Sequence, residues 1–288
     1  MKKNILLWLV AVLLMLAAVM YQRYTGPTKP YRGKVLLSGE QYRYALLRSH
    51  NTTSPAVISL PELKNDVYTA FLHYKRYGTN DEWTEVEMLP QDGNLSAELP
   101  LQPAAGKMEY YLTGESVSGA FRIPEAESET IILRYKDPVP PWVLVPHIIM
   151  MFFSVLFGMR AGISALFQPE SMRKWAKVAL IGMTVGGMIL GPIVQKYAFG
   201  EYWTGFPYGK DYTDNKMLIM WLSWLVAMLL IGWKSKDTGM KKRLIIVLAS
   251  VVMTITYLIP HSMGGSSLDY SKVDQGIDPY EAIKTGKD

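Results

Sequence analysis

The sequence predicts a membrane α-helical bundle of five spans that carries an inserted all-β domain. Long apolar runs lie near the start and through the second half of the 288 residues, whereas residues 24–137 are polar and contain short β-branched and aromatic segments. Lysine and arginine gather beside alternate apolar runs. We therefore divide the chain into a transmembrane anchor (1–23), a β-sandwich (24–137), a four-helix transmembrane domain (138–262) and a polar tail (263–288).

Each candidate span holds about 16 to 18 strongly apolar residues, and interfacial flanks bring it near the roughly 20 that cross a bilayer. The spans cover residues 5–20, 142–157, 178–194, 217–233 and 244–259. The first run follows Lys2 and Lys3, as in a signal peptide, but its long leucine-rich core and the sequence AAVMY favour a retained anchor. A cleaved signal peptide is the alternative, and it would leave four spans.

The positions of the cationic residues predict the orientation. They precede the first span and fill the segments between the second and third spans and between the fourth and fifth. These residues are Lys2, Lys3, Arg160, Arg173, Lys174, Lys177, Lys234, Lys236, Lys241, Lys242 and Arg243. Alternating spans place all of them on one side, which is the cytoplasm by the positive-inside rule. We expect a multi-pass protein of the bacterial inner membrane, with the β domain, residues 195–216 and the C-terminus extracytoplasmic.

The third span contains glycines four residues apart, at Gly182 and Gly186 and again at Gly187 and Gly191. Small residues at this spacing let helix backbones approach closely in lipid. We expect these glycines to pack against other helices of the same chain. Pro192 is expected to kink or end the helix.

The inserted domain shows about nine short strand-like segments over about a hundred residues, which is typical of a two-sheet β-sandwich. Turn signals separate them. They cover residues 34–37, 42–48, 56–60, 67–77, 83–89, 94–99, 107–113, 119–123 and 130–136. In the fourth segment His73 falls mid-strand beside aromatic residues, so we expect it to have a structural role.

Residues 72–124 resemble the second half of an immunoglobulin-like or fibronectin type III-like bacterial domain. The stretches YGTNDEWTEVEM, GNLSAELP, EYYL and GAFRIP carry the resemblance. It implies an immunoglobulin-like binding or spacer module and brings no catalytic residues, because this sandwich fold hosts many functions.

Composition excludes several functional classes. The chain has no cysteine, which removes disulfides, thiolate nucleophiles, cysteine-ligated zinc, iron–sulfur clusters and covalently attached haem. The formal net charge of +5 is modest and its cations lie beside the apolar runs, so nucleic acid is not an expected partner.

Two histidines near membrane boundaries are candidate cofactor ligands. His147 lies near the start of the second span and His261 follows the fifth, so both are expected at the outer face. Two histidines on different helices at similar depth are the minimal requirement for holding haem b. The sequence names no other cofactor.

A metal or hydrolytic site is a second hypothesis, because imidazole and carboxylate suit zinc or manganese. It would use His147, His261, Asp211, Asp214 and Asp269, or a serine at Ser262 or Ser266. However, the chain has no HExxH motif, calcium-loop spacing or G-x-S-x-G elbow. We therefore assign no catalytic or metal-binding residue.

A third hypothesis is structural. The aromatic residues of 195–216 would form an interfacial belt, its glycines and proline would form turns, and Thr213, Asp214 or Asn215 would cap the following helix. The two histidines would hydrogen-bond neighbouring helices or interfacial water.

We expect a binding or assembly role at the outer face, through a partner subunit, an envelope component or a small ligand. A haem protein or metal-dependent enzyme is the alternative. The lipid bilayer is the other expected partner. The residues expected to bind a ligand or partner are Gln195, Trp203, Asp211, Asp214, Asn215 and Lys216. The stretches VPHIIMMF, GPIVQKYAFGEYWTGFPYGKDYTDNK and IPHSMGGSSLDYS resemble a group of uncharacterised bacterial membrane proteins, and this resemblance implies no mechanism.

Overall fold

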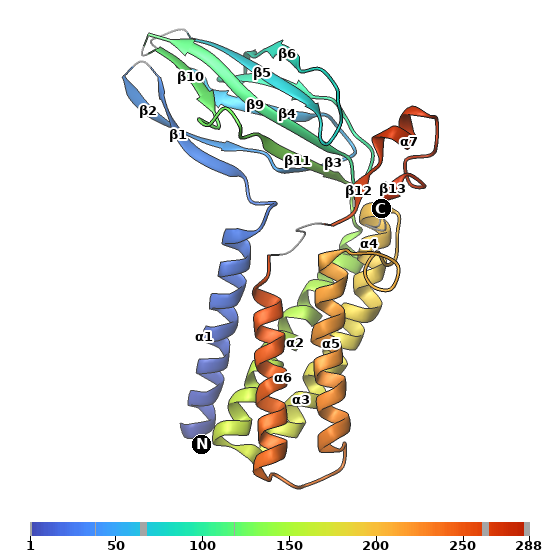
Figure 1. The fold of residues 1–288 in the computed structure, drawn as a ribbon. Coiled ribbons are helices and arrows are strands. Elements are labelled where there is room, and N and C mark those ends of the chain that lie inside the picture. The colour runs from blue at the N-terminus through green and yellow to red at the C-terminus, as the bar shows by residue number, and fades with distance from the viewer. Residues whose placement is uncertain (1, 38, 64–67, 118, 261–264, 285–288) are drawn as a thin grey trace. The chain divides into compact units, whose positions relative to one another are not determined.

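The computed structural model describes residues 2–37, 39–63, 68–117, 119–260 and 265–284 (Figure 1). The chain forms two compact units. The helical unit comprises Met1–Pro27 and Val139–Gly265, and the β unit comprises Thr28–Pro138 and Ser266–Lys284. The C-terminal segment was expected to be a separate polar tail, but its described part folds with the β unit.

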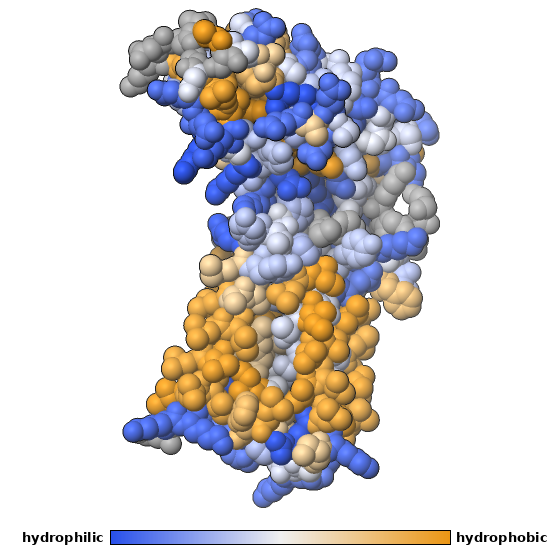
Figure 2. All heavy atoms as spheres, turned by 60° about the vertical axis from the view of Figure 1, so that its left-hand side comes forward, coloured by the Kyte–Doolittle hydropathy of each residue, from blue (hydrophilic) through white to orange (hydrophobic). Residues whose placement is uncertain are grey.

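The helical unit contains helices that are long and apolar enough to cross a membrane. Its elements are α1 (Lys2–Thr25), α2 (Pro141–Phe167), α3 (Pro169–Met183), the π-helical segment η1 (Thr184–Leu190), α4 (Gly191–Phe199), α5 (Tyr212–Ile231) and α6 (Met240–Leu258). Among the described residues, four helices meet the criteria for a span: α1, α2, the continuous helix Pro169–Phe199 and α5. Apolar side chains dominate the face of this unit that Figure 2 shows, so these helices are suited to contact a lipid bilayer.

The fifth predicted span corresponds to α6, which is not among those four helices. Its first turn carries Lys241, Lys242 and Arg243, and in a helix of only 19 residues every stretch of spanning length contains these three charges. The helix nevertheless packs against α2 and α5. A count of five spans therefore stays a prediction.

The glycines of the third predicted span pack against helices of the same chain, as expected. A Cβ atom at Gly182 would collide with Ser154 of α2, and one at Gly187 would collide with Met217 of α5. A Cβ atom at Gly186 would lie 2.7 Å from the Cβ of Met150. Such distances are too short for real side chains. The flexible Met217 side chain can shift, but at Gly186 the Cβ and backbone of Met150 cannot, so glycine there keeps α2 and η1 in contact.

Pro192 does not end its helix, which continues to Phe199. The backbone just before it is π-helical, so the N–H of Gly191 bonds to the carbonyl of Gly186 five residues earlier. Pro192 follows directly, where the backbone changes from π-helical to α-helical hydrogen bonding. A proline costs little at such a position, because its missing N–H interrupts no continuous run of α-helical bonds.

Two of the arginines that predict the orientation also cap helix C-termini. Arg173 donates to the carbonyls of Ile231 (3.1 Å) and Gly232 (2.9 Å), at the end of α5. Arg243 donates to those of Ala165 (2.6 Å) and Leu166 (2.7 Å), at the end of α2. Cations are favoured at these ends because the last carbonyls lack helical partners and the helix dipole is negative there.

The β unit contains three sheets from residues before Pro138. The strands are β1 (Tyr31–Leu37), β2 (Glu40–Leu46), β3 (Ser49–Asn51), β4 (Ala56–Pro61), β5 (Thr69–Arg76), β6 (Thr84–Glu87), β7 (Leu89–Gln91), β8 (Asn94–Leu99), β9 (Lys107–Ser116), β10 (Gly119–Ile123) and β11 (Ile131–Lys136). One sheet has the order β3-β11-β9-β5-β6, with β10 also paired to β9; β4-β8-β7 and β1-β2 form the others. The β3–β11 pair is parallel.

One hydrophobic core joins these sheets. In β9 the side chains alternate, so Met108, Tyr110 and Leu112 are buried. They belong to the same cluster as Ile58 of β4 and Leu99 of β8, from the three-stranded sheet. Burial of one face of each sheet is what the period-2 pattern of the sequence predicts.

Each of the nine predicted strand segments overlaps an observed strand. Segment 83–89, however, contains parts of two strands. The chain leaves β6 in the six-stranded sheet at Met88, whose N–H bonds to Ala70, and enters β7 in the three-stranded sheet. Strand β3 was not predicted. Alternation continues through a change of sheet, so it does not reveal where the change occurs.

The C-terminal segment is bound to the β unit through side chains. It contains β12 (Ser267–Leu268), α7 (Tyr270–Asp274) and β13 (Ile283–Lys284). The buried Tyr270 hydroxyl accepts from the Lys107 N–H and donates to the Lys107 carbonyl, both at 2.9 Å. Arg76 bonds Asp274 at 2.6 Å and Asp81 at 2.7 Å, and its hydrogen bond is the main cause that lowers the pKa of Asp81.

Replacing Tyr270 with phenylalanine is expected to loosen this segment. The variant loses the two hydrogen bonds between the hydroxyl and the backbone of Lys107, whose carbonyl keeps the N–H of Tyr77. Each lost bond is expected to cost about 0.5–1.5 kcal/mol. Hydrogen exchange in Ser266–Lys284, followed by mass spectrometry, should become faster. The matched control is Tyr280→Phe, because that hydroxyl bonds Asp137 at an exposed position. Equal exchange in the two variants would show that Tyr270 does not hold the segment.

Candidate functional site

Several of the predicted site residues meet around Thr204 in the helical unit. Gln195, in α4, donates to the Thr204 hydroxyl at 2.6 Å. The Asp214 Oδ2 accepts from the backbone N–H of Thr204 (2.6 Å) and of Gly205 (3.0 Å). The Thr204 hydroxyl lies 3.2 Å from Asp211 Oδ2 and 3.3 Å from Asp214 Oδ2. Thr204, Asp211 and Asp214 are all buried. We call Gln195, Thr204, Asp211, Asp214 and Asn215 the Thr204 network.

The network also starts helix α5. Asp211 is the N-cap: its Oδ1 accepts from the N–H of Thr213 at 2.7 Å and of Asp214 at 3.4 Å. Asn215 Oδ1 accepts from the N–H of Phe206 at 2.7 Å. The expectation that residue 213, 214 or 215 caps the helix was wrong, because α5 begins at Tyr212, ahead of its apolar run. The first turn of α5 instead binds the loop.

The loop between α4 and α5 depends on a glycine at position 205 and on hydrogen bonds to its backbone. A Cβ atom at Gly205 would lie 2.6 Å from the Cβ of Asp214 and 2.8 Å from Asn215 Oδ1. Trp203 donates its ring N–H to the Phe206 carbonyl at 3.0 Å. Each of these side chains therefore satisfies a backbone group of the same loop, which gives the loop one defined conformation.

Lys216 is turned away from the network. Its side chain is 5% exposed, and its ammonium donates to the carbonyl of Ile259 just after α6. Gln22, near the end of α1, donates to the carbonyls of Tyr257 and Ile259. The last carbonyls of a helix lack helical partners, and Pro260 has no N–H to offer. Lys216 and Gln22 thus connect the ends of three helices.

His147 binds a neighbouring helix. Its Nδ1 lies 2.8 Å from the carbonyl of Gly186, in η1. This contact matches the structural hypothesis, and it leaves the haem hypothesis untested because His261 lies outside the described residues. In the described parts of the chain, no group of three or more His, Cys, Asp or Glu side chains is placed to hold a metal ion. Asp269, also considered as a ligand, caps α7 through the N–H of Ser271.

A second candidate site, which the sequence analysis did not select, lies on the outward face of the six-stranded sheet. His73 of β5 stacks on Tyr111 of β9 with ring centroids 4.4 Å apart, and Trp83 contacts the same tyrosine edge-on at 4.9 Å. The Arg122 guanidinium lies over Tyr111 at 4.3 Å, and the Lys75 ammonium lies over Trp83 at 5.2 Å. We call these five residues the aromatic–cation cluster.

The cluster is held in place by hydrogen bonds. His73 Nε2 lies 2.7 Å from Thr113 Oγ1 and its Nδ1 lies 3.5 Å from Glu85, and burial lowers the pKa of His73. Its expected structural role agrees with these contacts. Arg122 donates to four backbone carbonyls of the segment that follows β10, those of Pro124, Ala126, Glu127 and Glu129. Trp83 remains 38% exposed.

The sequence predicts which of these residues share a face of one strand, but not that they meet across strands. Strand register places Tyr111 opposite His73 and places Arg122 opposite Thr113. Alternation indicates which residues share a face of one strand, but it does not say which strands are neighbours. No protein-family model matches this chain, and no curated protein matches it in sequence.

Proposed function

We propose that this is a multi-pass protein of the bacterial inner membrane that presents an immunoglobulin-like β unit outside the cytoplasm and binds a partner protein there. The aromatic–cation cluster is the proposed contact surface. The residues first expected to bind a ligand, in the Thr204 network, have their described polar contacts with the loop and with α5. They are proposed to fix the shape of the outer loop.

The distribution of cations supports the orientation. Arg173 and Arg243 contact the ends of α5 and α2, and Lys241 and Lys242 lie in the first turn of α6. Along the chain, one predicted span separates each of these cationic segments from the β unit or from the loop 195–216. In this proposal α6 is the fifth span, because its apolar part packs against α2 and α5 and buries Ile246, Ala249 and Met253.

The observation that carries the binding role is the partly exposed aromatic–cation cluster. Tryptophan, tyrosine and arginine are enriched among the residues that contribute most of the binding energy of protein interfaces. Here Tyr111 and Arg122 lie on the paired strands β9 and β10, and Trp83 immediately precedes β6. Backbone carbonyls hold Arg122, and Tyr111 stacks on His73, which Thr113 and Glu85 contact. A surface that is ordered before binding loses little conformational entropy when a partner arrives.

The test is recovery of partners after cross-linking in native membranes, with the full-length protein purified and its partners quantified by mass spectrometry. Trp83→Ala should reduce recovery of a specific partner at least tenfold, which corresponds to about 1.4 kcal/mol. The control is Leu89→Ala, which removes a side chain that is 60% exposed on the three-stranded sheet. Equal recovery in both variants would exclude the cluster as the contact surface.

The same purified sample tests the alternative. A Soret absorption band that disappears in His147→Ala would assign a haem role to the helical unit instead. A reporter fused after Asp288 should be extracytoplasmic, and a cytoplasmic signal would overturn the proposed orientation.

A further inference from the structure

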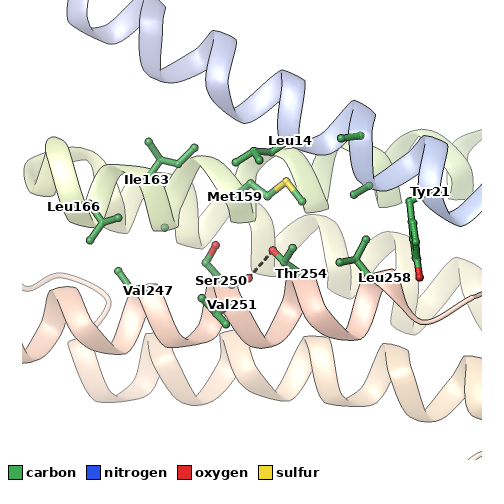
Figure 3. A pocket seen from close by; sticks show the side chains of 13 residues that line it. Leu14, Tyr21, Met159, Ile163, Leu166, Val247, Ser250, Val251, Thr254 and Leu258 are labelled. Carbon is green, nitrogen blue, oxygen red and sulfur yellow. Dashed lines mark hydrogen bonds between the residues drawn. The ribbon is translucent and has the colours of Figure 1, made fainter.

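A groove of about 550 Å³ runs between α1, α2 and α6 of the helical unit (Figure 3). Its lining is almost entirely apolar and includes Leu14, Ala17, Ile163, Leu166, Val251 and Leu258. Two of its three hydroxyls have partners along the helices: Ser250 donates to the Gly158 carbonyl at 3.1 Å and Thr254 to the Ser250 carbonyl at 2.8 Å. The third hydroxyl belongs to Tyr21. The groove therefore offers a surface suited mainly to hydrocarbon.

Helices α2 and α6 form the floor of the groove, and α1 forms its wall. A Cβ atom at Gly162 would collide with Ser250, so α2 and α6 approach closely and form the floor. Helix α1 forms the wall, and the side chain at Ala17 is too small to fill the space between them. Along α6 the lining extends from Val247 to Leu258, roughly 16 Å at the rise of an α-helix. This is about half of the 30 Å hydrocarbon thickness of a bilayer, or one leaflet.

Size distinguishes two kinds of occupant. A helix with side chains is at least about 10 Å wide, so a segment of this length would need roughly 1,250 Å³. The groove would enclose only part of such a segment. An extended acyl chain is much narrower than a helix, and its methylene groups match the apolar lining.

A cation lies at one end of the groove. Arg243 is one helical turn before Val247 on α6, and its guanidinium donates to the carbonyl of Leu166, a lining residue. It is half-buried, and among the described residues it forms no ion pair. The nearest acidic residue along the chain, Asp237, pairs with Lys242 at 3.1 Å. Guanidinium groups bind phosphate well, because their N–H donors match its oxygens.

We propose that this groove binds one acyl chain of an anionic phospholipid whose phosphate contacts Arg243. In the proposed orientation this lipid belongs to the cytoplasmic leaflet, where anionic headgroups meet the positively charged ends of the helices. The site does not depend on the partner-binding role of the β unit.

The test uses the full-length protein in nanodiscs that contain equal amounts of phosphatidylglycerol and phosphatidylcholine. Native mass spectrometry after release should show one retained phosphatidylglycerol per chain. Ala17→Phe fills the groove and should lower this retention at least fivefold. Leu13→Phe is the matched control, because Leu13 is 65% exposed on the same helix and does not line the groove.

A second pair of variants tests the headgroup. Arg243→Gln should abolish the preference for phosphatidylglycerol over phosphatidylcholine, whereas Lys241→Gln, at an exposed position of the same helical turn, should keep it. Because Arg243 also caps α2, the Ala17→Phe result decides the proposal if Arg243→Gln does not fold. Unchanged lipid retention in Ala17→Phe would overturn it. So would a dimer that dissociates in that variant, because a second copy would then cover the groove.

Discussion

Replacing Asp214 with alanine is expected to open the loop between α4 and α5 and to lower the free energy of unfolding of the helical unit by about 2–6 kcal/mol. One carboxylate oxygen accepts from two backbone N–H groups, those of Thr204 and Gly205. Both residues are buried, so water does not readily replace the lost acceptor. An unsatisfied buried donor costs about 1–3 kcal/mol, and two of them give the expected range.

Hydrogen exchange measures this effect at the two amides concerned. The amides of Thr204 and Gly205 should lose protection in Asp214→Ala, and thermal unfolding in detergent should occur at lower temperature. Glu201→Ala is the control, because it removes a carboxylate from the same loop at a half-buried position. Asp214→Asn keeps one acceptor oxygen and should lie between the wild type and Asp214→Ala. If both amides stay protected without the carboxylate, the Thr204 network does not hold the loop.

Replacing Gly186 with alanine is expected to destabilise the helical unit, whereas the same change at Gly191 is expected to be tolerated. A Cβ atom at Gly186 lies 2.7 Å from the Met150 Cβ and 3.3 Å from the backbone of the same residue, so α2 itself must move. Overpacking of this kind costs about 1–3 kcal/mol. At Gly191 the nearest atom is a His147 ring carbon at 3.7 Å, an ordinary contact.

The two alanine variants are chemically identical changes five residues apart, so their difference isolates the helix contact. Thermal unfolding of both proteins in one detergent should show a midpoint several degrees lower for Gly186→Ala only. The shift of α2 should also lengthen the contact between His147 and the Gly186 carbonyl, which the imidazole resonances would report. Equal midpoints would mean that the approach of α2 and η1 is not limited by Gly186.

The Thr204 network shows how far the sequence predicts the candidate site. The residue types of Gln195, Asp211, Asp214 and Asn215 indicated a polar cluster, and the structure brings them to one loop. The residue at its centre was missed, because a threonine between tryptophan and glycine looks like any turn residue. Its importance comes from partners up to ten positions away. Lys216 was grouped with them by proximity in sequence, but it binds the end of α6 instead.

The C-terminal segment shows a similar limit in the β unit. Residues after 263 are mostly polar, which is why they were expected to form a tail. A few apolar side chains of this segment are nevertheless buried: Leu268, Tyr270, Ala282 and Ile283. Two-residue strands and a helix of one turn produce no measurable periodicity. Contacts with distant residues, such as those on β5 and β9, reveal that the segment is folded.

Hydropathy, alternation and glycine spacing correctly predicted the apolar helices, the strand segments and the helix contacts of Gly182 and Gly186. These features act between residues that are close in sequence, so their patterns are visible in the chain itself. The aromatic–cation cluster, the acceptors of Lys216 and the groove beside α1 became visible only in the tertiary structure. Each depends on which distant segments pair or pack, and residues far apart along one sequence carry no local mark of their contact.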